Sequence, residues 1–260
     1  MGKQCQCWLW GGASHLGGRK EQQDRWSVYI TPEKDGLLAV IADGLGGHCD
    51  GALAAQAVID AAKEFIHVDL EILRVRPQEA VLLLCERAQT AVAAVSARAH
   101  STMVALWLYQ DQAYWMHIGD SRFYHLRAGR RLVRTRDHST AQMLMELGEI
   151  SEAEIANHPD QNRLYRCLGG GQPAKPEIGS GSVSTGDLLV LCSDGLWEHV
   201  SEAELWASTY SRQLKVMART LVERAASRGG PQADNATLVL VRLRPQETRG
   251  WSWVRYLRPS

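Results

Sequence analysis

The chain has 260 residues, a length that suits one large domain or two small ones. Its 29 Lys and Arg balance 29 Asp and Glu, and this zero net charge argues against a nucleic-acid-binding protein, which normally carries a basic excess. A composition of 45% hydrophobic and 22% charged residues excludes a disordered, collagenous or coiled-coil chain. No run approaches the roughly 18 apolar residues of a transmembrane span. Six cysteines without a C-x-x-C pair favour a reduced, cytoplasmic protein over a disulfide scaffold.

The first hundred residues predict two strands followed by two helices. A β-prone run at 26–30 and a continuous apolar run at 37–42 are joined by a turn that contains Pro and Gly. The apolar run has no polar face, so we expect a strand that is buried on both sides. Apolar residues at three- and four-residue spacing then predict helices over 53–66 and, after Pro77, over 81–95.

From Thr102 the chain changes to short strands rich in aromatic residues. Turn-like segments separate these strands, so we expect an antiparallel meander. Its four strands are predicted at 103–109, 113–118, 123–127 and 132–133. The remaining sequence predicts helices at 139–147 and 214–226, a capping box at 151–154 that opens a short helix, and strands at 187–192 and 237–243.

Strands therefore come in blocks around a central helical block rather than alternating with helices. This order favours an α+β fold built as a layered sandwich. No internal repeat and no linker rich in Pro, Gly and Ser divides the chain. We expect one domain over 1–244 and a short C-terminal tail over 245–260. The two Trp and nearby Arg of the tail are compatible with attachment at a membrane interface, but its pattern favours packing on the domain or on a partner.

Three aspartates lie at the ends of apolar strands. Asp43 follows the run 38–42, Asp194 follows the run 188–193, and Asp234 lies just before the strand that starts at Thr237. A single Asp-Gly after a strand is usually a turn. Two such turns after buried strands, with a third Asp beside another strand, indicate that the fold brings these carboxylates together.

Clustered carboxylates repel one another and must take up protons or a cation. Ligands that are all oxygen atoms favour Mg²⁺ or Mn²⁺ over Zn²⁺. A glycine at position 44 leaves its carbonyl free to approach an ion. Two ions that share a bridging carboxylate and a water are suited to the hydrolysis of phosphate esters.

Eight segments of the chain resemble, in order, the motifs of the metal-dependent protein phosphatases of the 2C-like (PPM) family, in their compact bacterial form. The segments are 19–24 (RKEQQD), 42–48 (ADGLGGH), 101–102 (ST), 119–122 (GDSR), 137–139 (DHS), 164–169 (LYRCLG), 192–196 (CSDGL) and 234–237 (DNAT). One such motif would be weak evidence, but eight in family order cover nearly the whole chain. The resemblance implies a central antiparallel β-sandwich flanked by helical layers.

The resemblance also implies a function and its partners. The chain would be a serine/threonine protein phosphatase that hydrolyses phosphoserine and phosphothreonine by direct attack of a water bridging two metal ions, without a phosphoenzyme. Its substrates would be phosphorylated proteins, and it would oppose a bacterial Ser/Thr kinase. We expect a monomer, with substrate recognition in a variable flap over about 139–176.

The implied metal centre uses two core ions, Mn²⁺ or Mg²⁺. Asp43 would bridge the two ions, with the Gly44 carbonyl and a water held by Asp24 on one of them. Asp194 and Asp234 would complete the coordination of the other ion.

Two further residues have implied roles. Asp120, together with Asp194, would hold a weaker third ion. Arg19 would bind the substrate phosphate, so that Arg19, Asp43 and Asp194 are the residues implied in catalysis.

Several positions depart from the family pattern. Gln22 replaces the usual Asn and Gln23 stands where many relatives have Glu, which predicts weaker binding at one ion. Ser101 replaces Gly, and we expect this change to lie away from the ligands. Leu45 stands where animal members carry a histidine proposed as the general acid, so either His48 or a metal-bound water protonates the leaving group.

Two rival functions come from other classes. The first is a non-catalytic, phosphatase-like regulator that binds phosphoproteins, and retention of all three core aspartates argues against it. The second is a dinucleotide-binding oxidoreductase suggested by glycines 44, 46 and 47, but Cys49 stands where the third glycine of G-x-G-x-x-G is needed. Ser121 and Ser193 beside aspartates suggest nucleophiles, yet the chain has no G-x-S-x-G motif.

Overall fold

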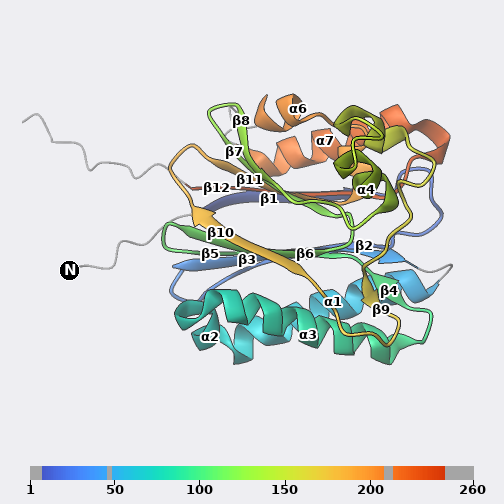
Figure 1. Cartoon of the computed structure of the whole chain (residues 1–260). Coiled ribbons are helices and arrows are strands. Elements are labelled where there is room, and N and C mark those ends of the chain that lie inside the picture. The colour runs from blue at the N-terminus through green and yellow to red at the C-terminus, as the bar shows by residue number, and fades with distance from the viewer. Residues whose placement is uncertain (1–7, 46–48, 208–212, 244–260) are drawn as a thin grey trace, which may run out of the picture.

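The computed structural model describes residues 8–45, 49–207 and 213–243. Two antiparallel sheets stack face to face, with helices α1, α2 and α3 covering one outer face and α4, α6 and α7 lying over the other (Figure 1). The predicted α+β class, with a central antiparallel sandwich between helical layers, is confirmed.

The strands are β1 (Trp8–His15), β2 (Asp24–Ile30), β3 (Gly36–Leu45), β4 (His100–Ser101), β5 (Met103–Tyr109), β6 (Gln112–Ile118), β7 (Arg122–Arg127), β8 (Arg130–Arg134), β9 (Leu168–Gly169), β10 (Glu177–Ser182), β11 (Leu188–Cys192) and β12 (Ala236–Leu243). The helices are α1 (Cys49–Val68), α2 (Leu70–Val75), α3 (Pro77–Val95), α4 (Thr140–Glu146), α5 (Asp194–Trp197), α6 (Glu202–Ala207) and α7 (Leu214–Gly229), with 3-10 turns η1 (Glu152–Asn157) and η3 (Gly230–Gln232).

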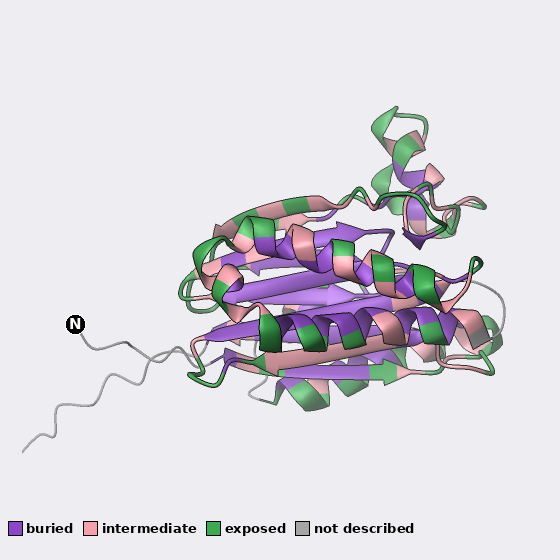
Figure 2. Ribbon diagram, turned by 90° about the horizontal axis from the view of Figure 1, so that it is seen from below, coloured by how far each residue is buried: buried purple, intermediate pink, exposed green. Residues whose placement is uncertain are grey.

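The larger sheet has the order β10-β6-β5-β3-β4-β9, and β2 also pairs with β3. Its central strand β3 contains the predicted apolar run 37–42, in which every residue is fully buried. Leu38 and Val40 pack under α1 and α3, whereas Leu37 and Ile41 face the other sheet. The absence of a polar face in this sequence is therefore explained by cover on both sides. Figure 2 shows the same cover from below, with buried stripes along the helices that face the sheet.

The smaller sheet has the order β1-β12-β11-β7-β8. Its outer face packs against α7, where Ala218, Leu221 and Val222 are buried. Its inner face meets the larger sheet through a shared apolar layer that includes Phe123 of β7 and Trp115 of β6, whose rings stack at 4.9 Å.

The predicted four-stranded meander is wrong in one respect. Strands β5 and β6 form a hairpin in the larger sheet, whereas β7 and β8 form a hairpin in the smaller one. The chain crosses between the sheets at Gly119-Asp120, where Gly119 has a φ of +102° that favours glycine. Turn residues in the sequence predict where one hairpin ends and the next begins. They do not predict whether the next hairpin joins the same sheet.

Several elements were not predicted, including β1, β10, α2, α5 and α6. Strand β1 contains Gly11 and Gly12, which are typical of loops. Here the glycines permit close approach, since a Cβ at Gly11 would lie 2.3 Å from the backbone of Leu214 in α7. None of the helices in the described ranges is both long and apolar enough to cross a membrane.

We expect Gly11→Ala to destabilise the fold by about 1–3 kcal/mol, because α7 must move away from β1 to admit the methyl group. Gly181→Ala in β10 is the matched control, since its Cβ would lie 3.7 Å from Trp115, an ordinary contact. Urea unfolding of both variants measures the difference. Equal stability of the two variants would contradict the close packing of α7 on β1.

Candidate metal centre

The predicted site residues meet at a cavity of about 500 Å³ where the ends of the two sheets come together. Residues that line the cavity include Arg19, Lys20, Glu21, Gln23, Asp43, Gly44, Leu45, Asn162, Asp194, Asp234 and Asn235. Asp24 and Asp120 are almost fully buried beside it, and their charges act on the carboxyl of Asp43. The structure therefore gathers every residue that the sequence analysis assigned to metal or phosphate.

Antiparallel pairing brings the first two carboxylates together. In the register of β2 and β3, Asp24 lies directly opposite Asp43. The Oγ of Ser193, at the end of β11, donates a hydrogen bond of 2.7 Å to Asp24 Oδ2 and accepts one of 2.9 Å from the N–H of Thr237. Ser193 thus joins three strands and is fully buried, a position that suits orientation of Asp24 and not nucleophilic attack.

The backbone of Asp43 is held by the segment at the start of β5. The N–H of Thr102 donates to the Asp43 carbonyl at 2.8 Å, and Thr102 Oγ1 accepts the Asp43 N–H at 3.0 Å. The hydroxyl of Ser101 donates to the same carbonyl at 3.0 Å. The expectation that Ser101 lies away from the ligands is therefore wrong, because a serine at this position reaches back to the neighbouring strand β3.

Asp120 sits on the crossover between the two sheets. Its backbone carbonyl accepts a hydrogen bond of 3.0 Å from Trp197 Nε1. The next residue, Ser121, shares a hydrogen bond of 2.8 Å with Thr102 Oγ1. Ser121 is also fully buried and so does not act as a nucleophile. Thr102 therefore contacts both the Asp43 strand and the Asp120 turn.

The carboxyl groups of this cluster resist ionisation. Burial raises the pKa of Asp24 to about 8 and of Asp194 to about 7, and neighbouring aspartates add to the effect. The pKa values of Asp43 and Asp120 are likewise raised well above their ordinary value, by burial and then by the charges of neighbouring carboxylates. A bound cation would relieve this repulsion.

Glu198 is an acidic group that the sequence analysis missed. Burial, together with the charges of Asp194 and Asp234, raises its pKa to about 8. It follows Asp194 by four residues through the short helix α5, and this spacing places both side chains on one helical face. That spacing is the signal that could have identified it.

Arg19 contacts the cluster from the solvent side. Its guanidinium donates a hydrogen bond of 2.6 Å to Asp234 Oδ2, and its side chain is 56% exposed. An exposed cation beside the cavity is available to an incoming anion. His48, the alternative proton donor, lies outside the described residues.

The donor set fits a hard divalent cation. Asp24 Oδ1 and Asp120 Oδ1 are buried and have no hydrogen-bond partner within the described part of the chain. Such orphaned carboxylate oxygens are costly unless an ion or water satisfies them. Gly44 admits no side chain, since a Cβ there would lie 1.9 Å from the carbonyl oxygen of Gly51. Oxygen donors alone favour Mg²⁺ or Mn²⁺.

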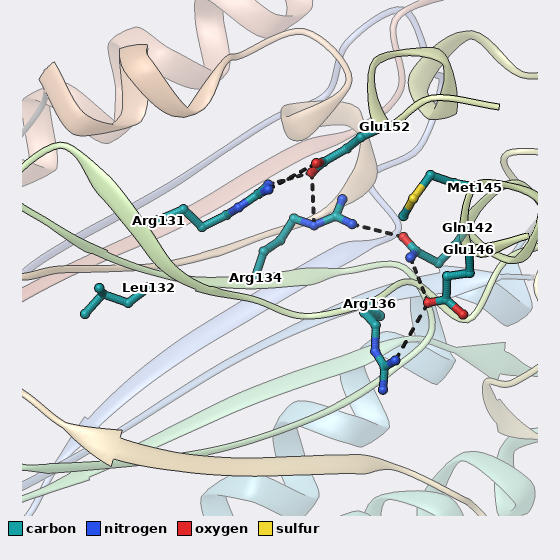
Figure 3. Close-up of a pocket in the computed structure, with 8 residues that line it drawn as sticks. All are labelled: Arg131, Leu132, Arg134, Arg136, Gln142, Met145, Glu146 and Glu152. Atoms are coloured by element: carbon teal, nitrogen blue, oxygen red, sulfur yellow. Dashed lines mark hydrogen bonds and ion pairs between the residues drawn. The ribbon is translucent and has the colours of Figure 1, made fainter. Parts of the chain in front are cut away.

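A second pocket of about 530 Å³ lies between β8 and the predicted flap (Figure 3). Arg131 and Arg134 point toward Glu152 of the flap, with N–O distances of 2.5 and 3.5 Å, and Arg134 also donates to Gln142 of α4 at 3.0 Å. The polar contacts along this pocket therefore hold the predicted flap against β8 of the smaller sheet. None of the clustered aspartates lines it.

A dinucleotide-binding site is excluded by the sheet. Strand β3, which contains Gly44, pairs antiparallel with both β2 and β5. The nucleotide-binding motif requires a parallel βαβ unit.

Comparison with known proteins agrees with this arrangement. Residues 11–241 match the family described as protein phosphatase 2C. The chain is 31% identical over 233 residues to the serine/threonine phosphatase Stp of Listeria innocua, a match that covers 86% of this chain and 90% of that protein. The fold and the family match are those of the bacterial serine/threonine phosphatases. The chain belongs to the protein phosphatase 2C family, as its eight motifs predict.

Solved structures show the same fold. The serine/threonine phosphatase of S. agalactiae matches with a TM-score of 0.79 at 27% identity, over 91% of this chain and 100% of that one. The catalytic domain of the serine/threonine protein phosphatase PstP, in complex with two manganese ions, matches with a TM-score of 0.72 at 28% identity, over 92% of this chain and 100% of that one.

The raised pKa values predict how stability depends on pH without metal. A carboxyl whose pKa is raised in the folded state stabilises the fold fully only below pH 3.8, the ordinary pKa of an aspartate in the unfolded chain. For Asp24 that stability is lost as the pH rises to about 8, its pKa in the folded state. Asp194→Asn deletes one of the repelling charges. In chelator, its melting temperature should therefore fall less than that of the parent between pH 5 and pH 8.

Saturating Mn²⁺ should raise the melting temperature of the parent by more than that of Asp194→Asn, because ions that bind only the folded state stabilise it. Melting curves of both proteins in chelator and in Mn²⁺ make the comparison. An equal rise in melting temperature of both proteins in Mn²⁺ would show that Asp194 is not a ligand. A clear loss of stability of the variant in chelator would instead assign Asp194 a structural hydrogen bond.

Proposed function

We propose that this protein is a metal-dependent phosphatase that hydrolyses phosphoserine and phosphothreonine in proteins, using two core Mn²⁺ or Mg²⁺ ions and a weaker third. One observation carries the proposal: aspartates from both sheets and from the crossover between them converge beside a cavity with an arginine at its rim, and three of them are buried. Membership of the protein phosphatase 2C family supports it.

The proposed ligands follow from their positions. Asp43 would bridge the core ions, with the Gly44 carbonyl on one ion and Asp24 holding a water of that ion. Asp194 and Asp234 would hold the other ion. Ser193 fixes one oxygen of Asp24 and leaves the other, buried oxygen without a partner among the described residues. The Gly195 N–H likewise fixes one oxygen of Asp194, donating to Oδ1 at 2.6 Å.

Bound divalent ions would supply Lewis-acid activation of the attacking water and of the phosphoryl oxygens. The chain itself would bind and orient the phosphate. Arg19 can offer two parallel N–H groups to a phosphate dianion, in place of its present contact with Asp234. The flap residue Asn162 lines the same cavity and is placed to contact the substrate next to the phosphate.

We further propose that the substrates are phosphorylated proteins of a bacterial Ser/Thr kinase and that the enzyme acts as a cytoplasmic monomer. The named relatives are bacterial serine/threonine phosphatases. The rival function, a non-catalytic regulator, is not favoured, because the acidic residues of the centre and Arg19 are all present.

Hydrolysis of p-nitrophenyl phosphate and of a phosphothreonine peptide tests the function. We expect turnover in Mn²⁺ and none above the blank in chelator. Asp43→Asn should reduce turnover to the chelator level, whereas Asp111→Asn, an exposed residue in the β5–β6 turn, should retain full activity. A parent that shows no metal-dependent turnover would favour the regulator.

Arg19→Ala should raise KM for the phosphopeptide by about tenfold with a smaller fall in kcat, because a charge-assisted hydrogen bond that binds ground and transition states alike is lost. Arg130→Ala, an exposed arginine of β8, is the control. Since Arg19 also contacts Asp234, Mn²⁺ binding by the variant is measured alongside. An unchanged KM would remove Arg19 from the phosphate site.

A further inference from the structure

Asp137 and His138 are neighbours in the sequence, and their contacts hold the two ends of the crossover 119–122, which carries Asp120. At the far end, Asp137 accepts two hydrogen bonds from the buried guanidinium of Arg122, at 2.6 and 2.8 Å. That guanidinium also lies 3.5 Å over the ring of Trp197, the residue whose Nε1 donates to the Asp120 carbonyl. The end of the crossover after Asp120 is therefore fixed by a buried, bidentate ion pair.

The near end is held by His138 through two hydrogen bonds to one residue. The N–H of Gly119 donates to His138 Nδ1 at 3.0 Å, and the N–H of His138 donates to the Gly119 carbonyl at 2.9 Å. These contacts fix the peptide groups on either side of Gly119. Because the second of those groups leads directly into Asp120, the ring and backbone of His138 set the direction in which the Asp120 side chain leaves the turn.

Gly119 has little room to adopt another position. A Cβ there would lie 2.7 Å from Thr102 Cγ2. The carboxyl that the turn presents is buried, and its Oδ1 has no partner among the described residues. An orphaned ligand oxygen on a backbone clamped from both sides is preorganised to bind an ion.

The protonation of His138 follows from these contacts. Since Nδ1 accepts from Gly119, the proton of the neutral ring is on Nε2, which lies 3.5 Å from Glu177 Oε1. Burial and the neighbouring His117, whose ring stacks at 4.8 Å, lower the pKa of His138 to about 4. The ring is therefore neutral at pH 7 and keeps the lone pair that accepts from Gly119.

His138 also meets both ends of the flap. Ser139, the next residue, caps helix α4. Near the other end of the flap, the N–H of Tyr165 donates to the His138 carbonyl at 2.9 Å. The residue that clamps the Asp120 turn is thus also the point from which the flap departs and to which it returns.

The same groups do not form a transition-metal site, although donor atoms of His117, His138 and Glu177 lie within 4.8 Å of one another. A metal on His138 Nε2 would move the ring proton to Nδ1, against the N–H of Gly119. The guanidinium groups of Arg136 and Arg166 also lie 3.6 and 3.9 Å from Glu177 and would repel a dication. The cluster is a hydrogen-bonded support.

We propose that His138 is a positioning residue for the peripheral ion of Asp120, and that it acts through Nδ1 and the Gly119 peptide. The inference rests on the proposed role of Asp120 in the phosphatase. It predicts that the acceptor at the Nδ1 position, and not the contact of Nε2 with Glu177, sets the affinity of the third ion.

Two substitutions separate the two sides of the ring. In His138→Asn, the side-chain oxygen occupies the place of Nδ1 and still accepts from Gly119, but nothing reaches Glu177. In His138→Gln, the longer side chain reaches toward Glu177 and leaves the Gly119 N–H without its acceptor. His125→Gln is the stability control, since His125 is also buried and bonds Asp187 at 2.8 Å, outside the metal centre.

Mn²⁺ titrations followed by electron paramagnetic resonance of the free ion give the number and affinity of bound ions. Below the melting temperature of every variant, His138→Gln should weaken the third ion by about 10- to 100-fold, the usual effect of removing an outer support, and leave the two core ions unchanged. His138→Asn should bind it as the parent does, to within about threefold, and His125→Gln should match the parent whatever its melting temperature.

Equal weakening by His138→Asn and His138→Gln would overturn the inference, and so would parent-like binding by both. A parent that binds only two Mn²⁺ ions would overturn it as well, while leaving a two-ion phosphatase intact. Failure of the proposed function has a different signature, since the parent would then show no Mn²⁺-dependent hydrolysis of p-nitrophenyl phosphate whatever number of ions it binds.

Discussion

Mutual repulsion among buried carboxylates is the constraint on which the rest of the structure depends. Asp24, Asp43, Asp120 and Asp194 are held close together in a region where burial already disfavours their charged forms. The fold must supply rigid supports to keep them there. Strand pairing between β2 and β3, the Ser193 bridge and the Thr102 contacts are such supports.

Much of this centre could be predicted from the sequence, because its main residues follow a local rule. Asp43, Asp194 and Asp234 lie at the ends of apolar strands, and strand ends meet at one edge of a sandwich. The apolar run 37–42 likewise predicts a strand covered on both faces, and all six of its residues are buried. The block order of strands and helices was enough for the fold class.

The remainder depended on contacts between distant segments, which local patterns do not reveal. Ser101 looked remote from the ligands, yet its hydroxyl crosses to the Asp43 carbonyl. The meander divided between two sheets because Trp115 and Phe123 face one another across the sandwich. Strand β1 was missed because its two glycines resemble a loop, although they serve the close packing of α7 and of Trp26.

The position of the acidic residues relative to the two sheets has a mechanical consequence. Asp24 and Asp43 belong to the larger sheet, Asp194 and Asp234 flank strands of the smaller one, and Asp120 lies on the crossover between them. Ions shared by these carboxylates would act as cross-links between the two layers of the sandwich, much as a disulfide joins two strands. Sliding of one layer over the other would therefore be resisted at this edge by the same ions that the proposed reaction would use.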